Sequence, residues 1–284
     1  MTNPSIDIES SNTGWKAQLD LSFIQDNHRT IIQDRKHFGP LQIQKPFYPE
    51  ADGTCHVYIL HPPGGVVGGD RFEIRIHVQS CAKALITTPA AGKFYRSAGP
   101  VAEQYQEIKV DAHSCLEWFP SENIFFSGGR ANIKTKVLLT DDSQFIGWDI
   151  SCLGRPACGE RFSQGSLDQR FELWIQDNPV CLERLLIKEN DLLLDANWGL
   201  AEKPVVGNLV CLTSRKDLVD LLRHNILSPE KRDFFSVTFV NGVILCRYLG
   251  NSVEQAKQIF IQAWHLLRIE LRGYPATIPR IWNT

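Results

Sequence analysis

Apolar and polar side chains alternate along much of the first 195 residues, in short segments separated by Gly, Pro, Asn and Asp. A period of two is typical of β-strands that bury one face. The apolar faces of two such segments carry Trp15, Ala17, Leu19, Leu21 and Phe23 in the first and Phe72, Ile74, Ile76 and Val78 in the second. Segments 134–140 and 145–152 are apolar on both faces, which is typical of strands buried between layers. The pattern predicts layered β-structure, and no repeat of roughly 20 to 50 residues is visible that would by itself indicate a solenoid.

The C-terminal part of the chain begins with a short helical pattern and a hairpin. Ser214 followed by Asp217 is similar to a capping box and predicts a helix through about Arg223. Further on, Asn241-Gly242 stands between two alternating apolar segments. Asn and Gly readily adopt the two positive φ angles of a type I′ turn, so this pair predicts a β-hairpin.

A second, longer helix is predicted near the end of the chain. Ser252 and Gln255 provide the cap, apolar side chains recur at helical spacing to about Arg272, and Gly273 follows as a stop. This region has more large apolar residues than one helix face can bury, so it predicts either a partner groove or core packing. The residues concerned are Trp264, Leu266, Leu267, Tyr274 and Trp282.

Length and composition indicate a folded protein of ordinary globular type. The 284 residues leave room for one large or two modest domains, and the 43% of apolar and 22% of charged residues are close to globular averages. No Ser/Gly linker divides the chain, so we expect a single domain over 1–284, with a β-rich body at 1–205 and an α/β appendage at 206–284. The expected fold class is mainly β, with a small C-terminal element that contains two helices and a hairpin.

Charge and hydropathy exclude several partners and locations. The formal net charge is −2 and the pI is near 6.4, so no global field attracts nucleic acid or anionic lipid, and neither is expected as a partner. Apolar runs are short, such as Val57 to Leu60, whereas a membrane-spanning helix needs about 20 residues. Residues 1–12 carry no signal-peptide pattern and the eight cysteines are scattered, so we expect a cytoplasmic protein with reduced cysteines.

The usual catalytic signatures are absent. The glycine-rich segment 61–70 is followed by a strand pattern, whereas a phosphate-binding loop is followed by a helix whose amides face the anion. No GxSxG, HExxH, CxxC or EF-hand pattern occurs, which excludes the signatures of serine hydrolases, zincins, zinc ribbons and calcium loops. Two alternatives stay open: a plain structural subunit, and a hydrolase or isomerase that uses Asp70 or Glu183 as general acid or base in a groove of the β-structure.

Several ordered blocks of sequence are more specific than a generic β-protein. They are the glycine-rich loop 61–70, the segment TTPAAGKFYRS at 87–97, LEWFP at 116–120, WDISCLGRPACGERF at 148–162, and IPRIW at 278–282. Together these blocks resemble the urease accessory proteins of the UreD family, called UreH in some organisms. The resemblance extends from Gly14-Trp15 to the last residues.

The resemblance implies both a fold and a function. The family fold is a β-rich, solenoid-like stack of strands with two helices. Members are not enzymes; they are scaffolds that bind apo-urease and, with UreF and UreG, deliver nickel to its active site. UreG supplies the GTPase activity, and UreF bridges it to UreD. A nickel path through the UreD body has been proposed for the family, so the resemblance implies nickel in transit and no tightly bound cofactor.

Physical chemistry indicates which residues would serve such a path. Nickel binds nitrogen and sulfur donors tightly, so a path that passes the ion onward needs weaker oxygen ligands. The candidates are carboxylates set among apolar residues, namely Asp70, Asp149, Glu183 and Glu117. Asp70 has the same parity as Phe72, so its carboxylate is expected to face the apolar side.

Each candidate also has a structural interpretation. A buried carboxylate can pair with an arginine, such as Arg96 or Arg155, or accept hydrogen bonds from backbone amides. The eight histidines form no i, i+4 pair, so isolated surface or hydrogen-bonded imidazoles are the plain interpretation. The alternative for His61, which precedes Pro62-Pro63, is a ligand in the loop.

Overall fold

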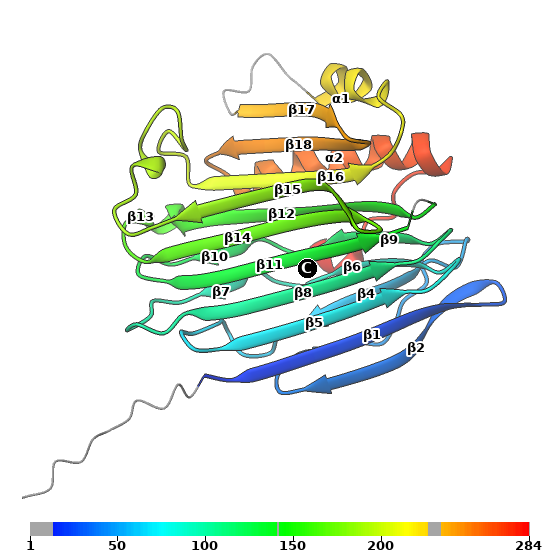
Figure 1. The fold of residues 1–284 in the computed structure, drawn as a ribbon, viewed down its shortest axis with the longest axis horizontal. Coiled ribbons are helices and arrows are strands. Elements are labelled where there is room, and N and C mark those ends of the chain that lie inside the picture. Colours follow the sequence, from blue (N-terminus) through cyan, green and yellow to red (C-terminus); the bar gives the residue numbers. More distant parts are fainter. Residues whose placement is uncertain (1–13, 141, 227–233, 284) are drawn as a thin grey trace, which may run out of the picture.

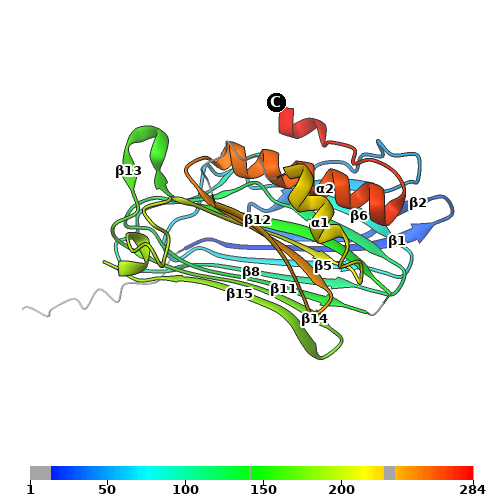
Figure 2. The ribbon, with the colours of Figure 1, turned by 90° about the horizontal axis from the view of Figure 1, so that it is seen from above.

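The computed structural model describes residues 14–140, 142–226 and 234–283. Within these residues the fold is mainly β, as predicted. A seven-stranded sheet faces an 11-stranded sheet, and the helices cover the outer side of the larger sheet (Figures 1 and 2). Residues 1–12, in which we found no signal-peptide pattern, lie outside the described part of the chain.

The two sheets draw their strands from all parts of the chain. In spatial order, the seven-stranded sheet runs β15 (Asn178–Ile187), β14 (Ser166–Ile175), β11 (Arg130–Leu139), β8 (Ala102–Val110), β5 (Arg71–Val78), β1 (Lys16–Asp26) and β2 (Arg29–Phe38). The 11-stranded sheet runs β17 (Phe234–Val240), β18 (Val243–Gly250), β16 (Val205–Leu212), β12 (Gln144–Arg155), β9 (Cys115–Phe119), β6 (Lys83–Thr87), β4 (Cys55–Leu60) and β3 (Gln42–Ile43). Beside this path lie β10 (Asn123–Phe125), β7 (Gly92–Phe94) and β13 (Glu160–Arg161).

The helices are short apart from one. The α-helices are α1 (Leu218–Ile226) and α2 (Val253–Arg272), and the 3-10 turns are η1 (Pro156–Cys158), η2 (Leu192–Leu194) and η3 (Arg280–Asn283). Strands β16 to β18, from the segment expected as an appendage, extend the larger sheet beside β12, and α1 and α2 pack on that extension.

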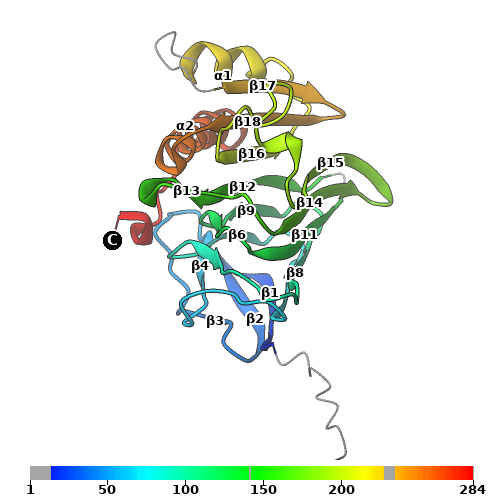
Figure 3. The ribbon, with the colours of Figure 1, turned by 90° about the vertical axis from the view of Figure 1, so that its left-hand side faces the viewer.

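The chain builds both sheets at once by passing back and forth between them. Strands β4, β6, β9 and β12 join the larger sheet, and β5, β8, β11 and β14, which follow them in turn, join the smaller one. Within each sheet successive strands pair in parallel. Parallel strands need a crossover of a dozen or more residues, and here the crossover of one sheet contains a strand of the other. The result is a solenoid-like stack (Figure 3), which backbone pairing produces without any sequence repeat.

Local sequence signals account for the hairpin and for the long helix. Asn241 and Gly242 have φ angles of 51° and 78°, as a type I′ turn requires, and they join β17 to β18. The Ser252 side chain accepts a hydrogen bond from the Gln255 amide at 3.2 Å and caps α2. Gly273, with φ of 77°, ends the helix. Both predictions are confirmed.

The predicted short helix is present, but two local details differ from the expectation. Helix α1 begins at Leu218 and not directly after Ser214, and the Asp217 carboxylate pairs with the Arg215 guanidinium. Trp15 was expected on the buried face of the first strand, but it precedes β1 and is 58% exposed.

The apolar residues form one core between the sheets and a second between the larger sheet and the helices. In the second core Trp264 and Leu267 are fully buried, and Trp282 packs against Trp148 with ring centroids 5.4 Å apart. Core packing, one of the two explanations that the sequence left open, therefore accounts for Trp264, Leu266, Leu267 and Trp282, whereas Tyr274 is half-buried and donates a hydrogen bond to Asp52 at 2.6 Å.

A buried ion cluster attaches α2 to the larger sheet. Arg268, with no exposed surface, lies 3.1 Å from a Glu117 oxygen through its Nε and also pairs with Glu50. The Trp264 indole donates to Glu117 at 2.8 Å, and Arg272 lies 3.4 Å from the same carboxylate. Removing one member of such a buried cluster leaves its partners charged and out of contact with water, which is strongly destabilising.

We therefore expect Arg268→Met to lower the free energy of unfolding by about 3 to 5 kcal/mol, measured by urea denaturation. The matched control is Arg170→Met, because Arg170 forms an exposed ion pair with Asp168 on the outer face of β14. Loss of an exposed pair should cost less than about 1 kcal/mol. Equal losses in the two variants would show that the cluster does not hold the helix.

Candidate functional site

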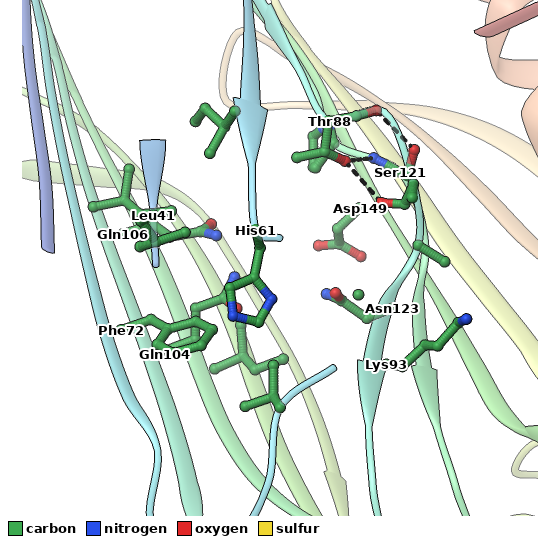
Figure 4. Close-up of a pocket in the computed structure, with 18 of the residues that line it drawn as sticks. Leu41, His61, Phe72, Thr88, Lys93, Gln104, Gln106, Ser121, Asn123 and Asp149 are labelled. Carbon is green, nitrogen blue, oxygen red and sulfur yellow. Dashed lines mark hydrogen bonds between the residues drawn. The ribbon is translucent and has the colours of Figure 1, made fainter. Parts of the chain in front are cut away.

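A cavity of about 310 Å³ lies between the two sheets (Figure 4). The seven-stranded sheet contributes residues of β5, β8, β11 and β14 to its wall, and the larger sheet contributes residues of β4, β9 and β12. The apolar part of the wall includes Leu41, Phe72, Trp118 and Phe171. Because an apolar wall holds few waters, any polar group that faces this space interacts strongly with what enters it.

Uncharged polar side chains form a belt on the cavity wall. Gln106, Thr135 and Gln169 stand on neighbouring strands at positions that face inward. Thr135 donates a hydrogen bond of 2.7 Å to Gln106, and Ser151 of the larger sheet donates one of 2.5 Å to Gln169. These bonds satisfy the buried groups and still leave oxygen and nitrogen atoms on the wall.

Asp149 brings a carboxyl group to the same cavity. It lies on β12, in the cavity wall opposite β8, the strand that carries Gln104 and Gln106 (Figure 4). Its hydrogen-bond partner is Asn208, a neutral amide. Burial raises the pKa of Asp149 to about 7, and the negative charge of Glu183 adds to this shift. Near neutral pH this carboxyl group is therefore close to the point at which it gains or loses a proton.

A row of paired residues links Asp149 to a groove at the side of the molecule. Asp149 lies opposite Asn208 on β16, and Asn208 lies opposite Arg247 on β18. Directly opposite residues share a face of a sheet, so all three side chains project toward the smaller sheet. Arg247 pairs there with Glu183 of β15 at 2.7 Å. Glu183 and Arg247 line a hollow of about 330 Å³ between β15 and β18. Of the predicted residues, the structure thus brings Asp149 and Glu183 together.

Asp70 lies outside the cavity wall, directly before β5, and is 4% exposed. Its carboxylate accepts hydrogen bonds from the Trp15 amide at 2.8 Å and from the Val67 amide at 2.9 Å. It therefore fastens the start of β1 to the glycine-rich loop, which corresponds to the backbone-amide interpretation left open for it.

Glu117 is separated from the cavity by the larger sheet, because its side chain belongs to the ion cluster beneath α2. The sequence-based suggestion that Arg96 or Arg155 pairs with these carboxylates is wrong. Glu117 pairs with Arg268 and Arg272, and Glu183 pairs with Arg247, whereas Arg155 pairs with Glu160. The true partners come from the C-terminal part of the chain, far away in sequence.

Sequence reasoning missed the polar belt. The available signal was parity: Gln106 stands in register with Ile108 and Val110, and Thr135 stands between Ile133 and Val137. A polar residue at a position whose neighbours of the same parity are apolar has to face the interior. Inward-facing neutral polar residues of this kind indicate a polar interior site, just as inward-facing carboxylates do.

The site has no ready-made metal cage. Within residues 14–140, 142–226 and 234–283, no group of three or more His, Cys, Asp and Glu side chains is placed to hold a metal ion.

In the same described residues, no helix has the length and apolar character needed to cross a membrane.

The raised pKa of Asp149 leads to a prediction about stability. The folded state holds the proton more tightly than the ordinary pKa of 3.8 allows, so ionising Asp149 costs increasingly more folding free energy as the pH rises from about 4 to about 7. Asp149→Asn should therefore stabilise the protein at about pH 8, by on the order of 2 to 4 kcal/mol, and have little effect at about pH 4. Urea denaturation at both pH values measures this.

Asp168→Asn is the matched control. Hydrogen bonds and ion pairs from Arg170 and Arg184 lower the pKa of Asp168, so its charge contributes stability above the ordinary pKa and loses it as the pH falls. This variant should be slightly less stable than the parent at about pH 8. If both variants shift stability in the same direction, the assignment of Asp149 as a poorly solvated acid is wrong.

Comparison with known proteins relates the sequence to one family. The family model described as UreD urease accessory protein matches residues 16–283. Urease accessory protein UreD 2 of Brucella anthropi is 41% identical over 273 residues, which cover 96% of this chain and 100% of that relative. Urease accessory protein UreD of Alcanivorax borkumensis is 42% identical over 275 residues, with 95% and 93% covered. The Klebsiella aerogenes protein of the same name is 39% identical over 271 residues, with 95% and 97% covered. The chain therefore belongs to the UreD family of urease accessory proteins.

Proposed function

We propose that this chain is a non-catalytic chaperone for the insertion of nickel into apo-urease, and that it conducts the ion through its interior. The observation that carries the proposal is the position of Asp149, a carboxyl group in the wall of a polar-belted cavity, linked through Asn208 and Arg247 to Glu183 in a groove at the side. Family membership supplies the urease context.

The chemistry of this route suits an ion in transit. Amide, hydroxyl and carboxylate oxygens bind nickel more weakly than clustered imidazoles and thiolates do, so the ion can enter and leave. Asp149 has a neutral amide as its partner, so its negative charge is not already cancelled by an arginine. Glu183 is held by Arg247, and an arriving cation would have to replace that guanidinium.

Asp70 and Glu117 have supporting roles in this proposal. Asp70 is saturated by backbone amides, and Glu117 lies in the ion cluster on the far side of the larger sheet. We expect both residues to stabilise the structure that surrounds the path. We do not expect either of them to bind the ion in turn. The hydrolase or isomerase alternative is less favoured, because Asp70 accepts hydrogen bonds from two backbone amides and Glu183, although it lines the hollow between β15 and β18, is paired with Arg247.

The partners in this proposal are apo-urease, UreF, and UreG bound through UreF, all in the cytoplasm. The helical layer on the larger sheet is where we expect UreF to dock. It is the outermost layer on that side (Figure 2), and Ile269 and Ile278 remain 40% and 38% exposed there while Trp264 is buried. Truncation at about residue 250 would remove α2 and uncover Glu117, so point substitutions at exposed positions are the better test of docking.

The proposal is tested by measuring nickel in matured urease. Asp149→Asn and Glu183→Gln, introduced in cells that express the complete urease operon, should each lower the nickel content of urease by roughly tenfold. Asp168→Asn, which makes the same change of charge on the outer face of β14, should leave it unchanged.

Assembly has to be verified in the same experiment. Copurification of each variant with apo-urease, UreF and UreG separates loss of passage from loss of binding. Normal nickel loading by an assembled Asp149→Asn complex would refute the conduction role. Failure of the unaltered chain to copurify with apo-urease would refute the chaperone role as a whole.

A further inference from the structure

We infer that His61 is the nitrogen ligand with which the cavity selects a transition-metal cation over magnesium or calcium. This inference rests on the proposed function, since it concerns which ion the same cavity accepts. Among the described residues that line the cavity, His61 is the only one with an imidazole or thiol side chain. The sequence left open whether His61 is a ligand in the glycine-rich loop or an isolated imidazole.

The position of the ring carries the argument. His61 follows directly after β4, and its imidazole lies between Phe72 and Gln104 on one side and Asn123 and Asp149 on the other (Figure 4). Its edge packs on the Phe72 ring with centroids 4.8 Å apart. Its Nε2 atom is buried and has no hydrogen-bond partner in the described part of the chain. A buried polar atom without a partner is costly, and the ring that carries it lines a cavity that a ligand can enter.

The surroundings keep the ring neutral and in place. Burial lowers the pKa of His61, although the negative charge of Asp70 opposes the shift. A neutral imidazole retains a lone pair on one ring nitrogen, which is the form that binds metals. Pro62 and Pro63 follow directly and have fixed φ angles, so the backbone that carries the ring has little freedom.

This donor set discriminates between classes of cation. Magnesium and calcium take oxygen ligands almost exclusively, whereas nickel, cobalt and copper gain from an imidazole. One nitrogen beside amide and carboxylate oxygens favours the second class. No cluster of three or more strong ligands surrounds it in the described residues, so the preferred ion is still released. His61 would thus give the path selectivity without trapping the cargo.

A direct test is anomalous diffraction at the nickel edge, on crystals of the full-length protein in its accessory complex soaked in nickel chloride with excess magnesium chloride. We expect a nickel peak at coordination distance from His61 Nε2. The peak should vanish in His61→Gln, which keeps a polar side chain but removes the nitrogen ligand. It should persist in His77→Gln, because His77 is an exposed imidazole paired with Asp111. Nickel on surface histidines only, or a cavity peak that survives His61→Gln, overturns the inference.

A functional test distinguishes this inference from the proposed function itself. At limiting nickel and high magnesium, His61→Gln and the second variant His61→Asn should lower the nickel content of urease by roughly tenfold, and added nickel should restore it. Both variants must still copurify with apo-urease. If Asp149→Asn abolishes loading while both His61 variants load normally at every nickel-to-magnesium ratio, the role of His61 is refuted and the conduction role stands. If Asp149→Asn and Glu183→Gln also load normally, the conduction role fails as well.

Discussion

A carboxylate removed from water needs a compensating partner, and the choice of partner decides what each acidic residue of this protein can do. Glu117 has two guanidinium groups, and Asp70 has two backbone amides. Both hold parts of the structure together, although all the contacts of Glu117 go to one carboxylate oxygen and the other has no hydrogen-bond partner in the described residues. Glu183 has a single arginine in an open groove. Asp149 has only a neutral amide, so of these four acids it alone directs an uncancelled charge at a cavity.

The solenoid-like stack explains why this cavity can be polar and still stable. Because the chain alternates between the sheets, inward positions of strands far apart in sequence become neighbours in one wall. Thr135 reaches Gln106 along the smaller sheet, and Ser151 reaches Gln169 across the gap between the sheets. Each buried group meets its partner without a charge. The cavity wall thus presents oxygen atoms that can bind a cation, and hydrogen bonds between neutral groups are enough to hold these atoms in place.

The fold class, the hairpin and the long helix were predictable because each depends on residues adjacent in sequence, such as Asn241-Gly242 and Ser252 with Gln255. The pairs that define the side groove and the ion cluster beneath α2 were not. Glu183 and Arg247 are 64 residues apart, and Glu50 and Arg268 are 218 apart. Periodicity predicts which face of a sheet a side chain occupies. It does not predict which strand lies beside that side chain, because the neighbouring strand comes from a part of the chain far away in sequence. Asp149 was therefore predictable as an inward-facing acid, and its link to Glu183 was not.

The raised pKa of Asp149 also bears on how a path can hold an ion and then release it. Desolvation disfavours the carboxylate in this cavity and raises its pKa to about 7, so the group gains or loses its proton near neutral pH. A cation in the cavity would supply the positive charge that the apolar walls do not, and would favour the ionised form. Uptake would then expel a proton, and release would take one back. The free energy needed to remove the proton offsets part of the attraction between the cation and the carboxylate. Asp149 therefore binds a cation less tightly than a permanently ionised carboxylate in the same place would. The desolvation of Asp149 is unfavourable for the folded protein, but in this way it would keep the cation from binding too tightly to move on.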